Sequence, residues 1–184
     1  MKVDSMEPVL IIIIVIALLI IGYISIYNKI QDYIVKIEKA EGIIDEDLRN
    51  KYDILLKINT YFTNVNEKNQ KDYLKDLKEL KQKEISNFEL ERKLMESETL
   101  LLDVYNDNIK YQENEELKQL LKDLKSKNEK ITAGISYYNN YTNKLNAYIR
   151  KIPNNFVAIT SRIKPKPFFD GKNMNDTNIN DFKL

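Results

Sequence analysis

Residues 9–27 read VLIIIIVIALLIIGYISIY, and the rest of the chain is organised around this stretch. Twelve of the thirteen residues from Val9 to Ile21 are Ile, Leu or Val, and no charged side chain occurs between Glu7 and Lys29. Nineteen helical residues rise about 29 Å, which matches the roughly 30 Å hydrocarbon core of a bilayer. At about −0.3 to −0.6 kcal/mol per large aliphatic residue, these twelve favour insertion by roughly 4 to 7 kcal/mol. We therefore predict a transmembrane helix over residues 9–27.

The flanks of this stretch favour a retained anchor over a cleaved signal. Tyr23 and Tyr27 lie one helical turn apart at its C-terminal end, where amphipathic rings prefer the membrane interface. Residues 1–8 form a short, slightly acidic leader, whereas a secretory signal begins with basic residues and ends at a small-residue cleavage site. The apolar run is also too long for such a signal.

Basic residues near the span indicate its orientation. Lys29, Lys36 and Lys39 follow the span, and Lys2 alone precedes it. The positive-inside rule then predicts a single-pass protein of the cell membrane, with the short N-terminus outside and the C-terminal body in the cytoplasm.

The composition excludes several classes of function. With 184 residues, one domain is expected beyond the span, and a net charge of +1 gives no general attraction to nucleic acid. The absence of Cys excludes disulfides and thiol catalysis, and the absence of His removes the commonest metal ligand and general base. We therefore predict no catalytic, cofactor-binding or metal-ligating residues, no cofactor, no small-molecule substrate and no enzymatic activity.

Residues 28–163 carry apolar side chains at helical spacing, and we interpret them as one helical-bundle domain. The first helix is predicted over residues 28–62, with a stripe at Ile30, Ile34, Ile37, Ala40, Ile44, Leu48, Leu55, Ile58 and Phe62. No Pro separates it from the span, so one helix can continue out of the bilayer. The second is predicted over residues 71–105, with a stripe at Leu77, Leu80, Phe88, Met95, Leu102 and Tyr105. Residues 63–70 read as a loop, and Asn106-Asp107-Asn108 ends the second helix.

The third helix, over residues 115–152, has the most regular pattern. One set of positions repeats every seven residues: Leu117, Leu124, Ile131, Tyr138, Leu145 and Ile152. A second set lies four residues after each of the first five members of that set: Leu121, Asn128, Ile135, Thr142 and Ile149. This is an a/d heptad pattern of the coiled-coil type, and Pro153 ends it.

These patterns predict an all-α fold, in which a single N-terminal transmembrane helix is followed by an antiparallel bundle of three or four long helices. Equal helix lengths and short connections suit an up-down-up order. Residues 164–184 form an extended or disordered tail. The X-Pro units at Lys164-Pro165 and Lys166-Pro167 favour extended backbone, and residues 170–184 are rich in Asn and Asp without periodicity.

Two carboxylate pairs are the nearest approach to a catalytic motif. Asp45 and Asp47, like Glu89 and Glu91, are two residues apart and therefore point to different faces of a helix. We interpret all four as solvated charges. A carboxylate cluster inside the bundle would instead indicate a metal site, but the sequence places Leu, Ile and Tyr at the interior positions.

Four further residues have both a structural and a functional interpretation. Tyr137, Tyr138 and Tyr141 either form a recognition surface or pack their rings into the bundle with the hydroxyls in water, and packing is the commoner outcome. Asn128, at a core heptad position, either fixes the helix register or binds a buried water.

Three stretches of the chain carry a family resemblance. The first follows the span: Tyr27-Asn28, Ala40, Asp45, Leu48, Tyr52-Asp53 and Leu55. The second is Asp103-Val104-Tyr105. The third, which is the most distinctive, comprises Tyr138-Asn139, Leu145-Asn146, Ile152-Pro153-Asn154-Asn155 and Lys164-Pro165-Lys166-Pro167-Phe168-Phe169.

Together with the N-terminal span, these stretches resemble the bacterial LemA family. The resemblance implies an all-α bundle on a single membrane anchor, and some members of the family are linked to membrane-compartment formation. Five positions depart from the family's usual residues: Glu41, Lys57, Asn106, Asn128 and Ile135.

The anchor and the long amphipathic helices predict a non-enzymatic, membrane-anchored interaction or scaffold protein. Its expected partners are the lipid bilayer and a protein, either a second copy or another chain. The alternative is an envelope coiled-coil component, such as a divisome or spanin-like tether, with the body outside the cytoplasm.

The heptad pattern makes a quantitative prediction about the third helix. Replacing Leu124 or Ile131 by Ala should each cost about 2 to 5 kcal/mol, because both side chains face the other helices. Replacing Lys125 or Lys130 by Ala should change stability by less than about 0.5 kcal/mol, because these neighbours rotate toward water. Chemical denaturation of a chain beginning at Asn28 measures all four. Equal losses at the lysines and the aliphatic residues would contradict the predicted register.

Overall fold

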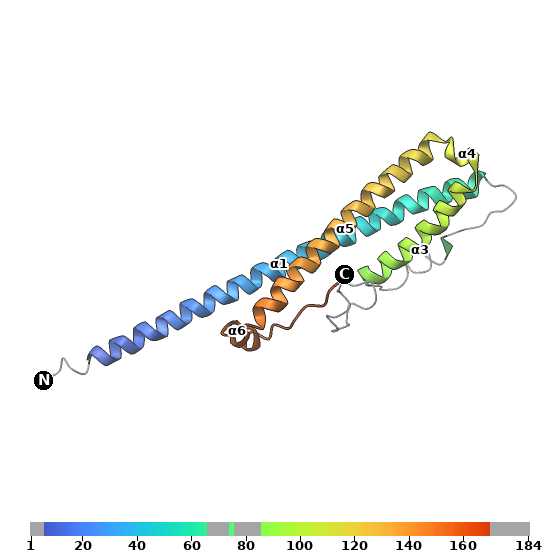
Figure 1. Ribbon diagram of the computed structural model, residues 1–184. Helices are drawn as coiled ribbons and strands as arrows, with labels where there is room; N and C mark the ends of the chain where they lie inside the picture. The colour runs from blue at the N-terminus through green and yellow to red at the C-terminus, as the bar shows by residue number, and fades with distance from the viewer. Residues whose placement is uncertain (1–5, 66–73, 76–85, 170–184) are drawn as a thin grey trace. The chain divides into compact units, whose positions relative to one another are not determined.

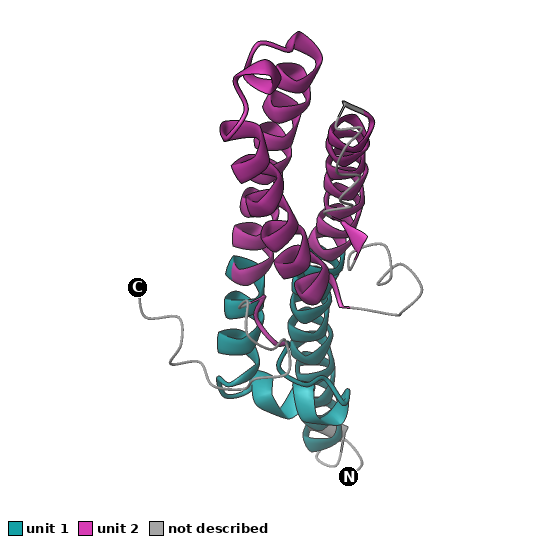
Figure 2. Cartoon of the chain, turned by 90° about the vertical axis from the view of Figure 1, so that its right-hand side faces the viewer, with its two compact units in different colours: residues 1–38, 140–166 teal, residues 39–139, 167–184 magenta. Residues whose placement is uncertain are grey.

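The computed structural model describes residues 6–65, 74–75 and 86–169, and the regular secondary structure of these residues is helical, without any β-strand. They divide into two compact units (Figure 2). Unit 1 comprises Met1–Glu38 and Asn140–Lys166, and unit 2 comprises Lys39–Asn139 and Pro167–Leu184. The predicted all-α class is confirmed.

The N-terminal helix α1, Met6–Val65, runs for 60 residues without a break (Figure 1). It joins the apolar stretch to the first predicted body helix. Pro8 does not interrupt it, because a Pro in the first helical turn costs no internal hydrogen bond. Its most apolar window has a mean hydropathy of 3.3 with 0% buried, so by length and composition α1 contains a candidate membrane span.

In unit 1, the last turns of α5, Glu115–Ile149, pack against α1 through aromatic rings. The Tyr33 ring lies 6.3 Å from that of Tyr141 and 5.7 Å from that of Tyr148. Ile30 and Ile37 of α1 and Leu145 of α5 are buried beside them. The helical stripe predicted for this part of α1 is thus the face that packs.

In unit 2, α1 and α5 run antiparallel. Asp47 of α1 pairs with Lys127 of α5. Further along α1, Tyr61 accepts a hydrogen bond from Asn114, which lies just before the start of α5. Later residues of α1 therefore meet earlier residues of α5. Their backbones approach closely at Gly134, where an added Cβ would lie 3.0 Å from Ile44 Cγ1. The unit buries most of the predicted apolar positions: Ala40, Ile44, Leu48, Leu55, Ile58, Phe62, Leu117, Leu124, Ile131 and Tyr138.

Helix α3, Asn87–Asn106, begins later than the helix predicted over residues 71–105. Ser86 is its N-cap, with extended backbone and a side chain that accepts a hydrogen bond from the Glu89 N–H, so no helix runs through it. Leu74, which is not one of the predicted stripe positions, is buried. The predicted stripe positions Leu77 and Leu80 lie outside the described residues. The predicted loop over residues 63–70 is wrong at residues 63–65, which belong to α1, and residues 66–70 lie outside the described residues.

The direction of α3 differs from the predicted up-down-up order. Glu98 of α3 contacts Asn128 of α5. Phe88 lies earlier in α3 and packs on Phe169. Phe169 is hydrogen-bonded to Asn139, which lies later in α5. Helix α3 is therefore antiparallel to α5 and parallel to α1 (Figure 1). The contacts of Glu98 with Lys51 of α1 and Asn128 of α5 hold α3 in this direction.

The apolar stripe of α3 also needs correction. Leu94 and Leu101 are buried, whereas the predicted Met95 is 53% exposed. The prediction followed steps of seven from Phe88, and a straight α-helix drifts by about 20° per heptad from that repeat. The stripe therefore moves by one position along the helix.

Polar residues set the ends of the remaining helices in unit 2. Helix α3 ends at Asn106, as predicted, and Asn108 caps the short helix α4, Ile109–Gln112, by accepting a hydrogen bond from the Lys110 N–H. Asn114 similarly accepts a bond from the Leu117 N–H at the start of α5.

Helix α5 ends at Ile149, three residues before the predicted end at residue 152. Ile152 is 87% exposed, so the last predicted heptad position is not in the core. Pro153 disfavours helical backbone at the residue before it, which accounts for the early end. A further short helix, α6, Asn154–Thr160, follows Pro153 and was not predicted.

Candidate functional site

A group of partly buried polar and charged side chains lies inside unit 2. Lys51 comes from α1, Glu91 and Glu98 from α3, and Asn128 from α5. We call these four residues the Lys51 cluster. They line a cavity of about 350 Å³ together with Met95, Thr99, Leu102, Ile131 and Thr132.

The Lys51–Glu98 ion pair is the centre of the cluster. Lys51 Nζ lies 2.6 Å from Glu98 Oε2, and the two side chains are only 3% and 15% exposed. Asn128 Nδ2 donates to the other oxygen, Glu98 Oε1, at 2.7 Å. Both carboxylate oxygens therefore have a donor, which is the condition under which a buried charge is tolerated. One Glu of α3 thus connects α1 to α5.

Glu91 is the second carboxyl group of the cluster. Burial raises its pKa, the positive charge of Lys51 acts in the opposite direction, and the negative charge of Glu98 raises the pKa further. It lies about two helical turns from Glu98 on the same side of α3, since the two are seven residues apart. The cluster therefore holds one well-paired carboxylate and one whose charge is disfavoured.

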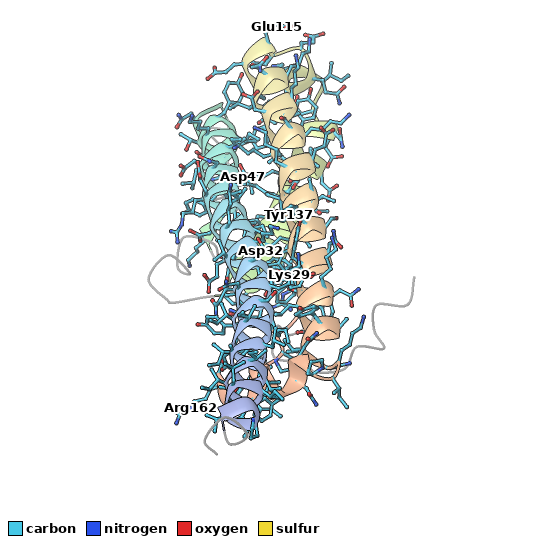
Figure 3. All side chains as sticks on the ribbon, turned by 90° about the vertical axis from the view of Figure 1, so that its left-hand side faces the viewer. Lys29, Asp32, Asp47, Glu115, Tyr137 and Arg162 are labelled. Atoms are coloured by element: carbon cyan, nitrogen blue, oxygen red, sulfur yellow. The ribbon has the colours of Figure 1, made fainter. Side chains whose placement is uncertain are left out.

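A second ion pair lies next to the cluster along both helices. Lys127 Nζ is 2.7 Å from Asp47 Oδ1, with side chains 22% and 12% exposed (Asp47 is labelled in Figure 3). Asp47 precedes Lys51 by one turn of α1, and Lys127 is adjacent to Asn128. The two ion pairs together fix the register of α1 against α3 and α5.

The carboxylate pairs singled out in the sequence are separated as predicted, but they are not all solvated. Asp45 forms a surface pair with Arg49, and Glu89 is exposed. Asp47 is buried and Glu91 is half-buried, which corrects the prediction for these two. Among the described residues, no three Asp or Glu side chains gather as metal ligands.

A second polar arrangement holds residues 164–169 along α5. In unit 2, Asn139 Nδ2 donates to Phe169 O at 3.1 Å and the Phe169 N–H donates to Asn139 Oδ1 at 2.8 Å, while Tyr138 Oη donates to Pro167 O. In unit 1, Asn146 makes the same two bonds with Lys166, at 2.8 and 2.9 Å. We call these two pairs the asparagine clasps.

The clasps connect two stretches of the most distinctive motif, the asparagines of α5 and the segment of residues 164–169, and the spacings in the two stretches match. Seven helical residues rise about 10.5 Å, and three extended residues span about 10 Å. Asparagines seven apart on α5 therefore match backbone groups three apart in the extended segment. Residues 164–169 are extended, as predicted, and the rest of the predicted tail lies outside the described residues.

The three tyrosines have separate environments. Tyr138 is 2% exposed in unit 2, with its ring 6.3 Å from that of Phe169. Tyr141 is half-buried in unit 1, where Lys36 and Lys144 lie over its ring. Tyr137 is 43% exposed. Two of the three rings thus pack into the bundle.

These features define a class of protein: an all-α chain that has, in its described part, one candidate membrane span and a helical body held by internal ion pairs and asparagine clasps. Residues 43–180 match the model of the LemA family, and the chain belongs to this family. The matched residues include the Lys51 cluster and both clasps. No curated protein matches the chain, and no solved structure matches it.

Of the five departures from the family's usual residues, Asn128 alone belongs to the Lys51 cluster. Glu41, Lys57 and Asn106 are exposed, and Ile135 is half-buried. Of the two interpretations of Asn128, a role in helix register is favoured by its bond to Glu98.

Because Lys51 is part of a buried ion pair, its substitution should cost far more stability than substitution of an exposed lysine of α1. Lys51→Met should destabilise the fold by about 3 to 5 kcal/mol, because Glu98 loses its counter-charge inside the bundle. Lys57→Met, on the exposed face of the same helix, should change stability by less than about 0.5 kcal/mol. Urea denaturation followed by circular dichroism measures both.

The double variant Lys51→Met with Glu98→Gln is the control for charge. Gln retains an oxygen for Asn128 and removes the unpaired negative charge, so most of the lost stability should return. Equal stability of Lys51→Met and Lys57→Met would refute the buried pair.

Proposed function

We propose that this LemA family member is a non-enzymatic, membrane-anchored interaction or scaffold protein. Residues 9–27 cross the bilayer once, the short N-terminus lies outside, and the helical body lies in the cytoplasm. Its partners are the bilayer and a protein, which is either a second copy or another chain.

One observation carries the proposal: α1 continues without a break from the apolar stretch into the body. Side chains of the stretch are widely exposed, for example Ile13 at 60% and Leu19 at 68%. The core helix of a water-soluble protein would be covered by its own chain, and this one is not. A bilayer covers such a surface and has the matching thickness.

The charged groups of the body support a structural rather than a catalytic role. Asp47, Lys51, Glu98 and Lys127 are each paired across helices, so their charges serve to join elements. A general acid or base acts on a substrate and needs access to it. These four groups are instead engaged with one another.

The orientation rests on the basic residues after the span. Lys29, Lys36 and Lys39 all lie within about 15 residues of its end, the range over which the positive-inside rule applies. Asp32 pairs with Lys36 at 2.8 Å, but acidic residues contribute little to this rule.

A reporter joined after Leu184 tests the orientation. A fluorescent protein at this position should fluoresce, and alkaline phosphatase there should be inactive, because both would lie in the cytoplasm. Phosphatase activity without fluorescence would place the body outside and favour an envelope tether instead.

Crosslinking in native membranes tests the scaffold role. A photoreactive amino acid at an exposed body position such as Tyr137 or Met95 should give a discrete crosslinked band, from a second copy or another protein. The same sample without irradiation is the control and should give none. The absence of any band from all exposed positions would contradict the proposal.

A further inference from the structure

The short helix α6 presents large apolar side chains away from its own unit. Val157 and Ala158 are buried in unit 1, whereas Phe156 is 65% exposed and Ile159 is 74% exposed. Phe156 and Ile159 are three residues apart and share a face of the helix. Ile152, just before α6, is 87% exposed. In water these side chains would form an apolar patch without a cover.

Hydrogen bonds within unit 1 fix the position of α6 relative to the apolar stretch of α1. Tyr23 Oη lies 3.1 Å from Thr160 Oγ1 and 3.0 Å from Ser161 Oγ, at the end of α6. Tyr23 belongs to residues 9–27 and lies one turn before their C-terminal end. If residues 9–27 cross a bilayer, α6 therefore lies at the level of its interface.

The charged residues that flank α6 in the sequence are all basic. Residues 150–166 contain five basic residues and no Asp or Glu: Arg150, Lys151, Arg162, Lys164 and Lys166. The first four are exposed. Exposed apolar side chains flanked by basic ones are the pattern of segments that lie in the surface of an anionic membrane.

We propose that residues 150–166 form a second membrane contact. The side chains of Ile152, Phe156 and Ile159 enter the boundary between headgroups and acyl chains, and the basic residues contact phosphates of anionic lipids. The inference rests on the proposed span, because α6 reaches the bilayer only if Tyr23 is at its interface. It goes beyond a single anchor, since the end of α5 is then also held at the membrane.

The charge argues for lipid over a second copy of the chain. Two copies that met through this surface would bring two sets of basic residues together without acidic partners, and like charges repel at short range. Anionic lipid supplies the opposite charge and an apolar layer in the same place.

Site-directed fluorescence tests the proposal on the full chain, which has no native Cys. Single variants Phe156→Cys and Ile159→Cys carry an environment-sensitive label, and their exposure means that the fold does not depend on either side chain. Asn140→Cys is the matched control, exposed on the unit 1 part of α5 and nine residues from its end, or about 14 Å. Ile16→Cys reports on the span itself.

The labelled chains are reconstituted into vesicles of equal parts phosphatidylcholine and phosphatidylglycerol that contain lipids with a quencher near the headgroup or deep in the acyl chain. Labels at positions 156 and 159 should be quenched several-fold more than the label at 140, and most strongly by the shallow quencher. The label at 16 should respond most to the deep quencher. In vesicles of phosphatidylcholine alone, quenching at 156 and 159 should fall while that at 16 is unchanged.

Three results would overturn the proposal, and they differ from one another. Quenching at 16 without quenching at 156 or 159 leaves the span intact and removes the second contact. A blue-shifted but unquenched label at 156 shows that protein, such as a second copy, covers this surface. No quenching at any position, 16 included, overturns the span as well.

Discussion

The proposed anchoring depends first on one feature: the apolar side chains of residues 9–27 are exposed, and α1 continues from them into the body without a break. In the proposed span, the aliphatic residues favour insertion by roughly 4 to 7 kcal/mol. The same helix continues through both compact units. No Pro interrupts α1 after its first turn, and Gly22 and Gly42 are tolerated within it. Each Gly costs the helix at most about 1 kcal/mol relative to Ala, which is small beside the free energy of exposing residues 9–27 to water.

Inside unit 2, the buried ion pairs decide which helix faces meet. Apolar side chains alone allow helices to slide or rotate, since Leu and Ile pack in several registers at similar cost. The pair between Lys51 and Glu98 allows one register, because a shift leaves a charge buried without a partner. Asn128 fixes the orientation of the Glu98 carboxylate by donating a hydrogen bond to its second oxygen. The polar cluster thus contributes specificity, and the surrounding Leu and Ile contribute most of the stability.

Periodicity was sufficient to predict the faces of α1 and α5, because residues such as Leu48 and Leu124 recur on one seam. It missed Lys51, although a signal was present: the apolar positions pass from Leu48 to Leu55 in one step of seven, and Lys51 lies between them on the same face. A charged residue in that gap is buried only if a partner arrives from another helix, and Glu98 lies 47 residues away in the sequence. The break at Ser86 and the helix α6 were missed because caps and short helices carry little periodic signal.

Alkaline carbonate extraction of membranes that carry the full chain tests the anchoring of α1 most directly, because it strips proteins held only at the surface. The account predicts that the chain stays in the membrane pellet. It also predicts release of the variant Ile13→Arg with Ile16→Asp, since two charges near the span centre cost roughly 5 to 7 kcal/mol and cancel the insertion free energy. Release of the unmodified chain would contradict the account.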